Sequence, residues 1–168
     1  SSRAYEKLQI PGFPKYGDHK NWMTQLGRNA VAAAPYMDYS ELEWLKECYT
    51  KTREELKDSG SARFERLDVI LSMRLAPIIH KSGESLSEDV FLADRDSADK
   101  GEILLGRQMI HMILDFLKTH RSMAVQYSYE DLKKVQWMGD AKIKDFYDKY
   151  RLIKNAVLDQ LPTEDAQI

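Results

Sequence analysis

The sequence predicts an all-α protein. Apolar residues return every three or four positions in several stretches, which is the period of one face of an α-helix. No stretch shows the two-residue alternation of a half-buried strand or the turn of a β-hairpin. The chain has 168 residues, of which 43% are hydrophobic, enough for one substantial core or two small helical lobes. We therefore expect a bundle of about six helices arranged in two lobes.

The first predicted helix follows a leading segment that is not helical. Residues 8–17 contain two prolines and two glycines, which restrict or redirect the backbone. Asp18 is suited to cap the N-terminus of the helix, and Pro35 is expected to end it. The apolar stripe that predicts this helix consists of Trp22, Leu26, Ala30 and Ala33.

Two further helices are predicted in the N-terminal part of the chain. One is capped by Ser40 and ends at Ser59 and Gly60. The next begins near Ser61 and is interrupted or ended by Pro77. Their apolar stripes consist of Leu42, Leu45, Tyr49 and Leu56 in the former, and of Phe64, Leu67, Leu71 and Leu75, widened by Ile70 and Met73, in the latter.

An acidic segment lies between the two predicted lobes. Residues 84–101 are polar and rich in Ser and Asp, and we interpret them as a linker or an insertion. The N-terminal helical lobe then comprises residues 8–83, and the C-terminal helical lobe comprises residues 102–163. This division places the apolar sequence ILLGRQMIHMILDFLK in the second lobe.

The C-terminal lobe is predicted to contain the most apolar helix of the chain. This helix covers about residues 98–119 and is apolar around most of its circumference, as expected for a helix surrounded by others. A short helix is expected over residues 128–135, followed by a turn at Gly139 and Asp140 and a last helix that ends at Pro162. The stripe of the last helix consists of Ile143, Phe146, Tyr147, Tyr150, Ile153, Val157 and Leu161.

The sequence offers no recognisable catalytic or metal-binding motif. Cys48 is the only cysteine, so neither an intrachain disulfide nor a thiolate zinc site can form, and we interpret it as a small apolar residue on a helix face. The four histidines lack metal-ligand spacing, and His111 is interpreted as a core or boundary residue. Asp94, Asp96 and Asp99 lack the spacing of a calcium loop. We predict no catalytic residue, no cofactor, no metal and no small-molecule substrate.

The charge and hydropathy of the chain limit its partners. The 25 basic and 27 acidic residues give a net charge of −2, which does not support a dedicated nucleic-acid binder. No apolar run approaches the ~18 residues of a membrane span, so we expect no membrane insertion and a cytoplasmic location, with a nuclear one as the alternative. Since the chain begins without Met, we expect it to be part of a longer protein.

Two stretches resemble the gag polyprotein of copia-type LTR retrotransposons. FPKYGDHKNWMTQL is similar to the start of such proteins, through Phe13, Pro14, Gly17, Trp22 and Leu26. ILDFLKTHRSM, with YEDLKKVQWMGDAKIKDFYDKYRLIKNAV, is similar to their second capsid lobe. The matching positions there are Phe116, Leu117, Leu132, Val135, Gly139, Ile143, Phe146, Tyr150 and Ile153. The chain departs from the family in its longer acidic insertion and in lacking both a Trp in the fourth helix and a zinc knuckle.

The resemblance implies a capsid-like or domesticated gag domain whose two helical lobes resemble capsid N- and C-terminal domains. Such a domain forms homo-oligomers and packages RNA. Family members associate through exposed helix faces of each lobe. We expect the interface to include Tyr36 and Tyr39 and, on the last helices, Trp137, Lys142 and Lys149. The resemblance implies no catalytic residue, so we expect a structural protein and not an enzyme.

Two other functions are compatible with the residues. A monomeric helical adaptor or scaffold would bind a partner peptide or helix in a groove between its helices. An enzyme with a helical fold would require a titratable group in a cleft, and no constellation in the sequence nominates one.

Overall fold

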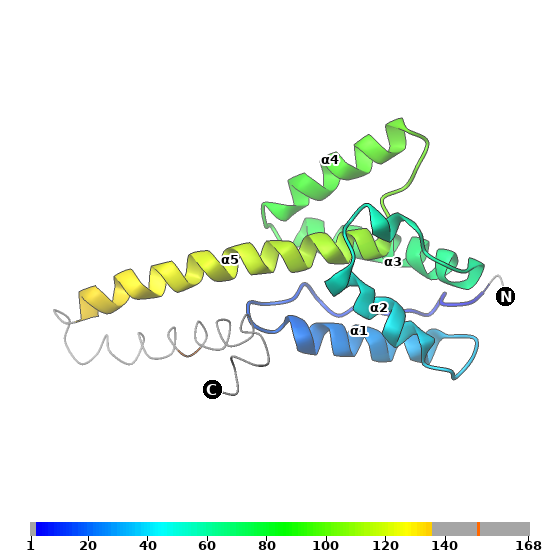
Figure 1. The fold of residues 1–168 in the computed structure, drawn as a ribbon, viewed down its shortest axis with the longest axis horizontal. Coiled ribbons are helices and arrows are strands. Elements are labelled where there is room, and N and C mark those ends of the chain that lie inside the picture. Colours follow the sequence, from blue (N-terminus) through cyan, green and yellow to red (C-terminus); the bar gives the residue numbers. More distant parts are fainter. Residues whose placement is uncertain (1–2, 136–150, 152–168) are drawn as a thin grey trace. The chain divides into compact units, whose positions relative to one another are not determined.

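The computed structural model describes residues 3–135 and residue 151, and all of the regular secondary structure in these residues is helical (Figure 1). It consists of five α-helices and one short 3-10 helix, so the predicted all-α class is confirmed. The chain divides into two compact units. The first comprises Ser1–Pro14 and Asn21–Leu114, and the second comprises Lys15–Lys20 and Asp115–Ile168.

Helix α1 (His19–Ala33) forms where the sequence predicted the first helix. Its Trp22, Leu26 and Ala30 are buried, which confirms most of the expected stripe. The segment before it is held against the helix by side chains, because Trp22 Nε1 donates to the carbonyl of Gly12 at 2.8 Å. Asn29 Nδ2 also donates to the carbonyl of Gln9 at 3.0 Å.

Helix α2 (Ser40–Thr50) is shorter than predicted, because the chain becomes extended at Lys51. A separate 3-10 helix, η1 (Glu55–Lys57), follows instead of a continuation to Gly60. Thr52 and Glu55 exchange the hydrogen bonds of a capping box in the turn that leads into η1. The amide of Glu55 donates to Thr52 Oγ1 at 3.1 Å, and the amide of Thr52 donates to Glu55 Oε1 at 3.2 Å. The T-x-x-E spacing was a sequence signal that α2 ends and a separate helix begins.

The buried face of α2 is also rotated from the predicted one. Trp44, Leu45 and Cys48 are buried, whereas Leu42 and Tyr49 are 40% and 47% exposed. The predicted stripe was therefore wrong at these two positions. Burial confirms the interpretation of Cys48 as a packing residue and raises the pKa of its thiol to about 12, so the nucleophilic thiolate is scarce at neutral pH.

Helix α3 (Ala62–Lys81) begins at its predicted cap, where Ser61 Oγ accepts a hydrogen bond from the amide of Phe64 at 3.3 Å. Its central stripe is fully buried, whereas Met73 is 65% exposed. Pro77 does not end the helix. Since Pro77 is exposed, water can satisfy the carbonyl that its missing N–H leaves unpaired. The buried residues of the stripe are Leu67, Ile70, Leu71, Leu75 and Ile79.

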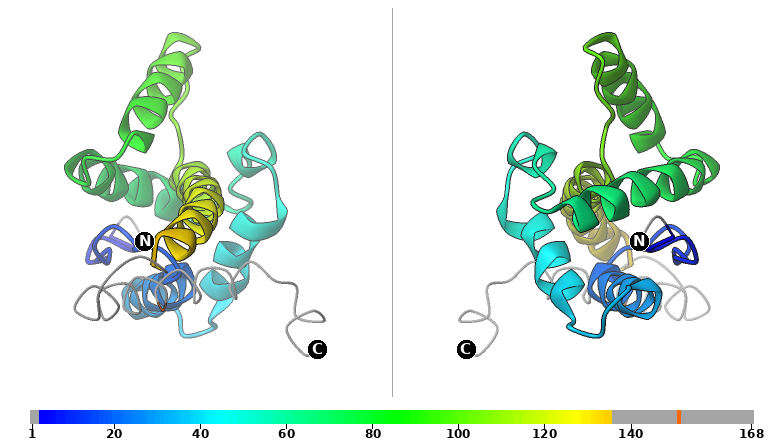
Figure 2. Two further views of the ribbon diagram at one scale, coloured as in Figure 1. Left: turned by 90° about the vertical axis from the view of Figure 1, so that its left-hand side faces the viewer. Right: turned by 90° about the vertical axis from the view of Figure 1, so that its right-hand side faces the viewer.

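Helix α4 (Leu86–Asp99) occupies the segment that the sequence suggested as a linker or insertion between lobes. It belongs to the first unit and buries only Leu86 and Val90. In both views α4 lies on the far side of α3 from α1 (Figures 1 and 2). The acidic residues 84–101 are thus mostly a helix, and the division between the two units falls elsewhere in the chain.

Helix α5 (Gly106–Val135) begins later than predicted and includes the short helix expected over residues 128–135. Its first half supplies much of the described core. The predicted turn at Gly139 and the last helix lie outside the described residues. None of the described helices is long and apolar enough to cross a membrane. The buried apolar residues of the first half are Met109, Ile110, Met112, Ile113 and Leu117.

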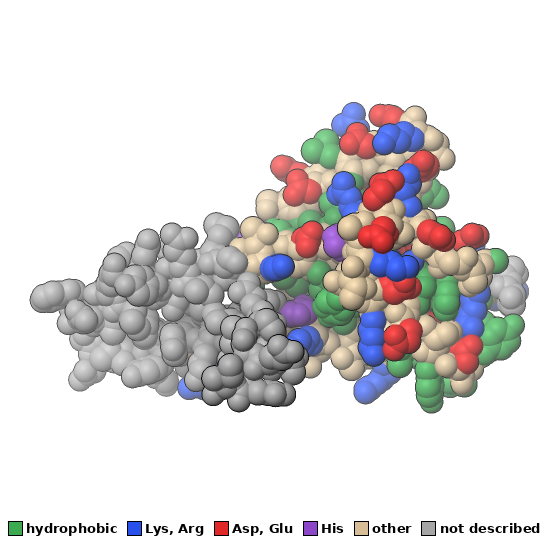
Figure 3. All heavy atoms as spheres, in the orientation of Figure 1, with side chains coloured by type: hydrophobic (Ala, Val, Ile, Leu, Met, Phe, Trp, Pro, Cys, Tyr) green, Lys and Arg blue, Asp and Glu red, His purple; other side chains and the backbone are tan. Residues whose placement is uncertain are grey.

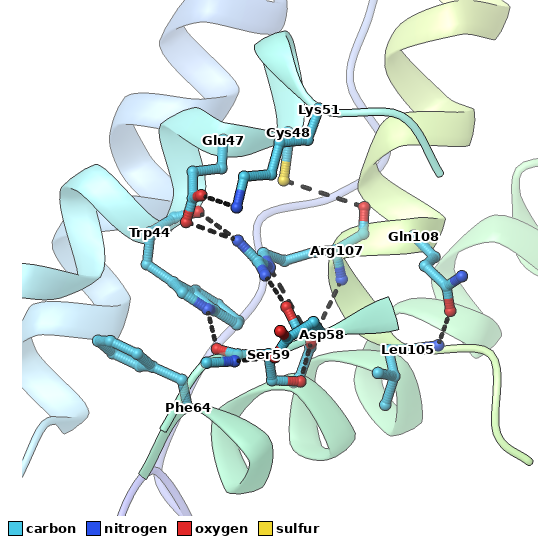
Figure 4. A network of polar contacts seen from close by, with 12 residues as sticks. Trp44, Glu47, Cys48, Lys51, Asp58, Ser59, Phe64, Leu105, Arg107 and Gln108 are labelled. Atoms are coloured by element: carbon cyan, nitrogen blue, oxygen red, sulfur yellow. Dashed lines mark hydrogen bonds and ion pairs between the residues drawn. The ribbon is translucent and has the colours of Figure 1, made fainter. Parts of the chain in front are cut away.

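A buried arginine joins the start of α5 to three other parts of the first unit (Figure 4). Arg107 is 1% exposed, and its Nη1 donates to the carbonyl of Trp44 and to Glu47 Oε1, both at 3.1 Å. Its Nη2 donates to the carbonyl of Asp58 at 2.7 Å. The guanidinium carbon lies 4.5 Å from the centre of the Trp44 ring, which adds a cation–π contact.

The Asp68 carboxylate of α3 completes this cluster. Its Oδ1 accepts from the backbone amide of Arg107 at 2.8 Å, and its Oδ2 accepts from Ser59 Oγ at 2.7 Å. Asp68 Oδ2 also lies 3.9 Å from Arg107 Nε. Burial raises the pKa of Asp68, and these hydrogen bonds oppose the rise. Asp68 therefore acts as a carboxylate cap for the positive N-terminal end of α5.

Gly106 allows α5 to approach α3 at this point. A Cβ atom on Gly106 would lie 2.1 Å from Leu71 Cβ and 2.8 Å from the carbonyl oxygen of Asp68. Both obstacles are parts of α3 that cannot move independently of that helix. The absence of a side chain at residue 106 is therefore a requirement of the packing.

We predict that Gly106→Ala lowers the free energy of unfolding by about 1–3 kcal/mol or more, because the new methyl group forces α5 away from α3. Urea unfolding followed by circular dichroism measures the change. Gly12→Ala is the matched control, since a Cβ there meets no atom within 4 Å, and it is expected to stay within about 1 kcal/mol of the wild type. Equal stability of both variants would contradict the packing argument.

We predict that Arg107→Met lowers the free energy of unfolding by about 3–5 kcal/mol, because it leaves Asp68 buried without its counter-charge. The exposed Arg28→Met in α1 is the control and is expected to have little effect. Adding Asp68→Asn to Arg107→Met removes the uncompensated charge and should recover part of the loss. An additive, more severe loss in the double variant would contradict a coupled ion pair.

Candidate interaction surface

No metal site is found in the described part of the chain, and the cluster around Arg107 is buried. No group of three or more His, Cys, Asp or Glu residues there is arranged to hold a metal ion. Arg107 and Asp68 are 1% and 0% exposed, so no substrate could reach them. Exposed apolar side chains are a stronger indication of function, because they mark candidate contacts with other proteins.

The loop between α1 and α2 carries such side chains. Tyr36, Met37 and Tyr39 are 63%, 76% and 59% exposed, and we call residues 36–39 the aromatic loop. Apolar side chains gather over the part of the first unit where α1 and α2 are joined, at the lower right of Figure 3. Leu42, in the first turn of α2, adds a further partly exposed apolar group.

Arg63 of α3 anchors the aromatic loop to the body of the first unit. Its Nη1 and Nη2 donate to the two carboxylate oxygens of Asp38 at 3.0 and 3.1 Å, a bidentate arrangement. The same guanidinium forms an ion pair with the buried Glu41, and its Nε donates to Tyr5 Oη at 2.7 Å. The guanidinium carbon also lies 5.2 Å from the centre of the Tyr36 ring.

The charges of this anchor stabilise one another. Hydrogen bonds from Arg63 hold the pKa of Asp38 below its usual value, and those bonds in turn raise the pKa of Arg63. Tyr5 Oη donates to Glu41 Oε2 at 2.6 Å. Burial, with the nearby Glu41 carboxylate, raises the pKa of Tyr5 from 10.0 to about 12. Tyr5 is therefore a neutral donor and Asp38 an ionised acceptor at neutral pH.

The backbone of the aromatic loop is also fixed locally. Asp38 Oδ1 accepts from the amide of Ser40 at 3.1 Å and from Ser40 Oγ at 2.8 Å, which forms an Asx turn. Tyr39 has a positive φ of 59°, a strained conformation for a residue other than glycine. The turn and the Arg63 anchor hold Tyr39 in this conformation although its side chain remains exposed.

The structure brings together some of the interface residues predicted from the sequence. Tyr36 and Tyr39 both lie on the aromatic loop and are exposed. Trp137, Lys142 and Lys149 lie outside the described residues. The sequence analysis missed Met37 and the anchoring residues Tyr5 and Arg63. Tyr5 and Arg63 are separated by 58 positions, and no local pattern signals their hydrogen bond.

Comparison with known protein families, with curated proteins and with solved structures finds no significant match to this chain. The candidate surface therefore depends on the geometry of the described residues. The resemblance to copia-type gag, stated from the sequence motifs, contributes only to the proposal below.

We predict that the anchor weakens at alkaline pH. The pKa of Tyr5 is raised in the folded state, so its contribution is complete below pH 10 and is lost as the pH rises to about 12. Urea unfolding at a series of pH values should show a smaller loss over this interval in Tyr5→Phe than in the wild type. Tyr39→Phe, at an exposed ring, is the control that should behave as the wild type. Identical profiles for Tyr5→Phe and wild type would contradict the assignment.

Proposed function

We propose that this chain is a structural, capsid-like domain that assembles by homo-oligomerisation. The resemblance to copia-type gag suggests this class of protein, and the aromatic loop supplies a surface suited to it. RNA packaging is left out of the proposal because the chain carries a net charge of −2.

The observation that carries the proposal is that the aromatic loop is exposed and yet fixed. Tyrosine, methionine and arginine are enriched in protein interfaces, and Tyr36, Met37 and Arg63 lie together here. A surface whose side chains and backbone are already ordered loses less conformational entropy on association. The hydrogen bonds of Asp38 and Arg63 provide that order before any partner binds.

Light scattering coupled to size-exclusion chromatography tests the proposal directly. The wild-type chain is expected to form species larger than a monomer as its concentration rises, and negative-stain electron microscopy should show rings or particles. A chain that remains monomeric at all concentrations and at high salt would overturn the proposal. If such a monomer captured one stoichiometric partner peptide, a helical adaptor would replace it.

We predict that Met37→Ser with Tyr39→Ser weakens self-association by about tenfold or more, because interface energy concentrates in a few large side chains. These positions leave the Arg63 anchor intact. Ile103→Ser is the matched control, since Ile103 is 57% exposed and lies outside the aromatic loop. Equal weakening by both variants would show that the effect is not specific to the loop.

A further inference from the structure

Helix α4 presents an apolar face that the described residues do not cover. Phe91 and Leu92 are 62% and 55% exposed, whereas the only residues that α4 buries are Leu86 and Val90. A helix of this length is only marginally stable in water without a packed face. The exposed pair is therefore a candidate contact for a partner.

The charge around this pair indicates the chemistry of the partner. Residues 84–102 contain seven acidic and two basic side chains, a net charge of −5. Asp89 and Asp96 lie three positions before and four positions after Leu92, so they flank it on the same face of the helix. The last turn of α4 has no basic residue to balance the helix dipole. A cationic, partly apolar surface would complement this face.

The exposed face of α3 carries the opposite charge. Arg66, Met73, Pro77 and Lys81 are all exposed and follow one another at intervals of seven, four and four residues, which places them along one side of the helix. Met73 is 65% exposed. This face thus consists of two apolar side chains between two cations, opposite in charge to the α4 face on which Asp89 and Asp96 flank Leu92.

Within one chain, the acidic face of α4 and the exposed face of α3 do not pair with each other. The residues that α4 buries are Leu86 and Val90, whereas Leu92 is 55% exposed. Among the ion pairs formed by residues 3–135, none joins α3 to α4. Because residues 84–102 carry −5 and the whole chain −2, the rest of the chain carries +3. Outside its own residues 84–102, a second copy therefore offers both the matching face and a positive net charge.

We propose that α4 of one copy docks onto the exposed face of α3 of a second copy. The contact pairs different surfaces on the two copies, so it is heterologous and can extend into a ring or a filament. This inference rests on the proposed self-association, and it adds a surface separate from the aromatic loop. The pairing of opposite charges makes the contact sensitive to salt.

A charge-swap experiment tests the contact. One variant carries Asp89→Lys and Asp96→Lys in α4, and the other carries Arg66→Glu and Lys81→Glu in α3. Each variant alone places like charges at the contact and is expected to weaken self-association at least about tenfold. Mixed in equal amounts, the two variants again offer opposite charges at both contacts, and association should return. Exchange of the exposed pair Glu43 and Lys46, by Glu43→Lys and Lys46→Glu, is the control that should leave association unchanged.

The outcomes separate this inference from the proposed function. If the wild type self-associates and neither charge variant differs from it, the α4 contact is wrong while the aromatic loop remains the assembly surface. Failure of the mixture to restore association would also overturn the contact, provided that circular dichroism shows both variants folded. If the wild type stays monomeric while a lysine-rich amphipathic peptide binds α4, the occupant is another protein and not a second copy.

Discussion

The buried Arg107 guanidinium is the interaction on which the first unit depends. It hydrogen-bonds to α2 and to the residue after η1, and Asp68 of α3 binds the backbone of the same residue. Burying an arginine requires acceptors for most of its donors and a counter-charge, and both Nη1 and Nη2 of Arg107 have acceptors. Such a cluster adds little net stability over apolar packing, but a misplaced α2 or α3 would leave buried charges unpaired. The cluster thus favours one arrangement of three helices, and Gly106 permits the approach that it requires.

A second arginine links this core arrangement to the candidate surface. Arg63 lies on the same helix as Asp68, so the position of α3 also sets the position of the aromatic loop. The bidentate pair with Asp38 and the contact with Tyr36 order a segment whose side chains are exposed. Rigidity and exposure usually exclude each other in loops, because exposed side chains make few contacts. Here the polar residues of the loop fix it through their hydrogen bonds, and its aromatic side chains remain available to a partner.

The sequence signals were sufficient to place α1 and α3, but not α2 and α4. α1 and α3 begin at or next to their predicted caps, because a capping residue next to a long apolar stripe is a local property. The stripe of α2 was misplaced because Glu41, a charged residue, occupies the buried face opposite Arg63. Residues 84–101 looked like a linker because their acidity hid the short stripe of Leu86 and Val90. Tyr36 and Tyr39 were predicted as interface residues, whereas the residues that hold them in place were not.

The sequence by itself determined the all-α class, the start of α1 and the Ser61 cap of α3, because each depends on residues that are close together in the chain. Only the tertiary structure decided which face of α2 is buried and why Gly106 lacks a side chain. It also decided how Tyr5, Asp38 and Arg63 meet. These properties arise from pairs of charges and close contacts between residues tens of positions apart. The free energy of such pairs depends on their burial and separation in space, which a pattern along one chain does not contain.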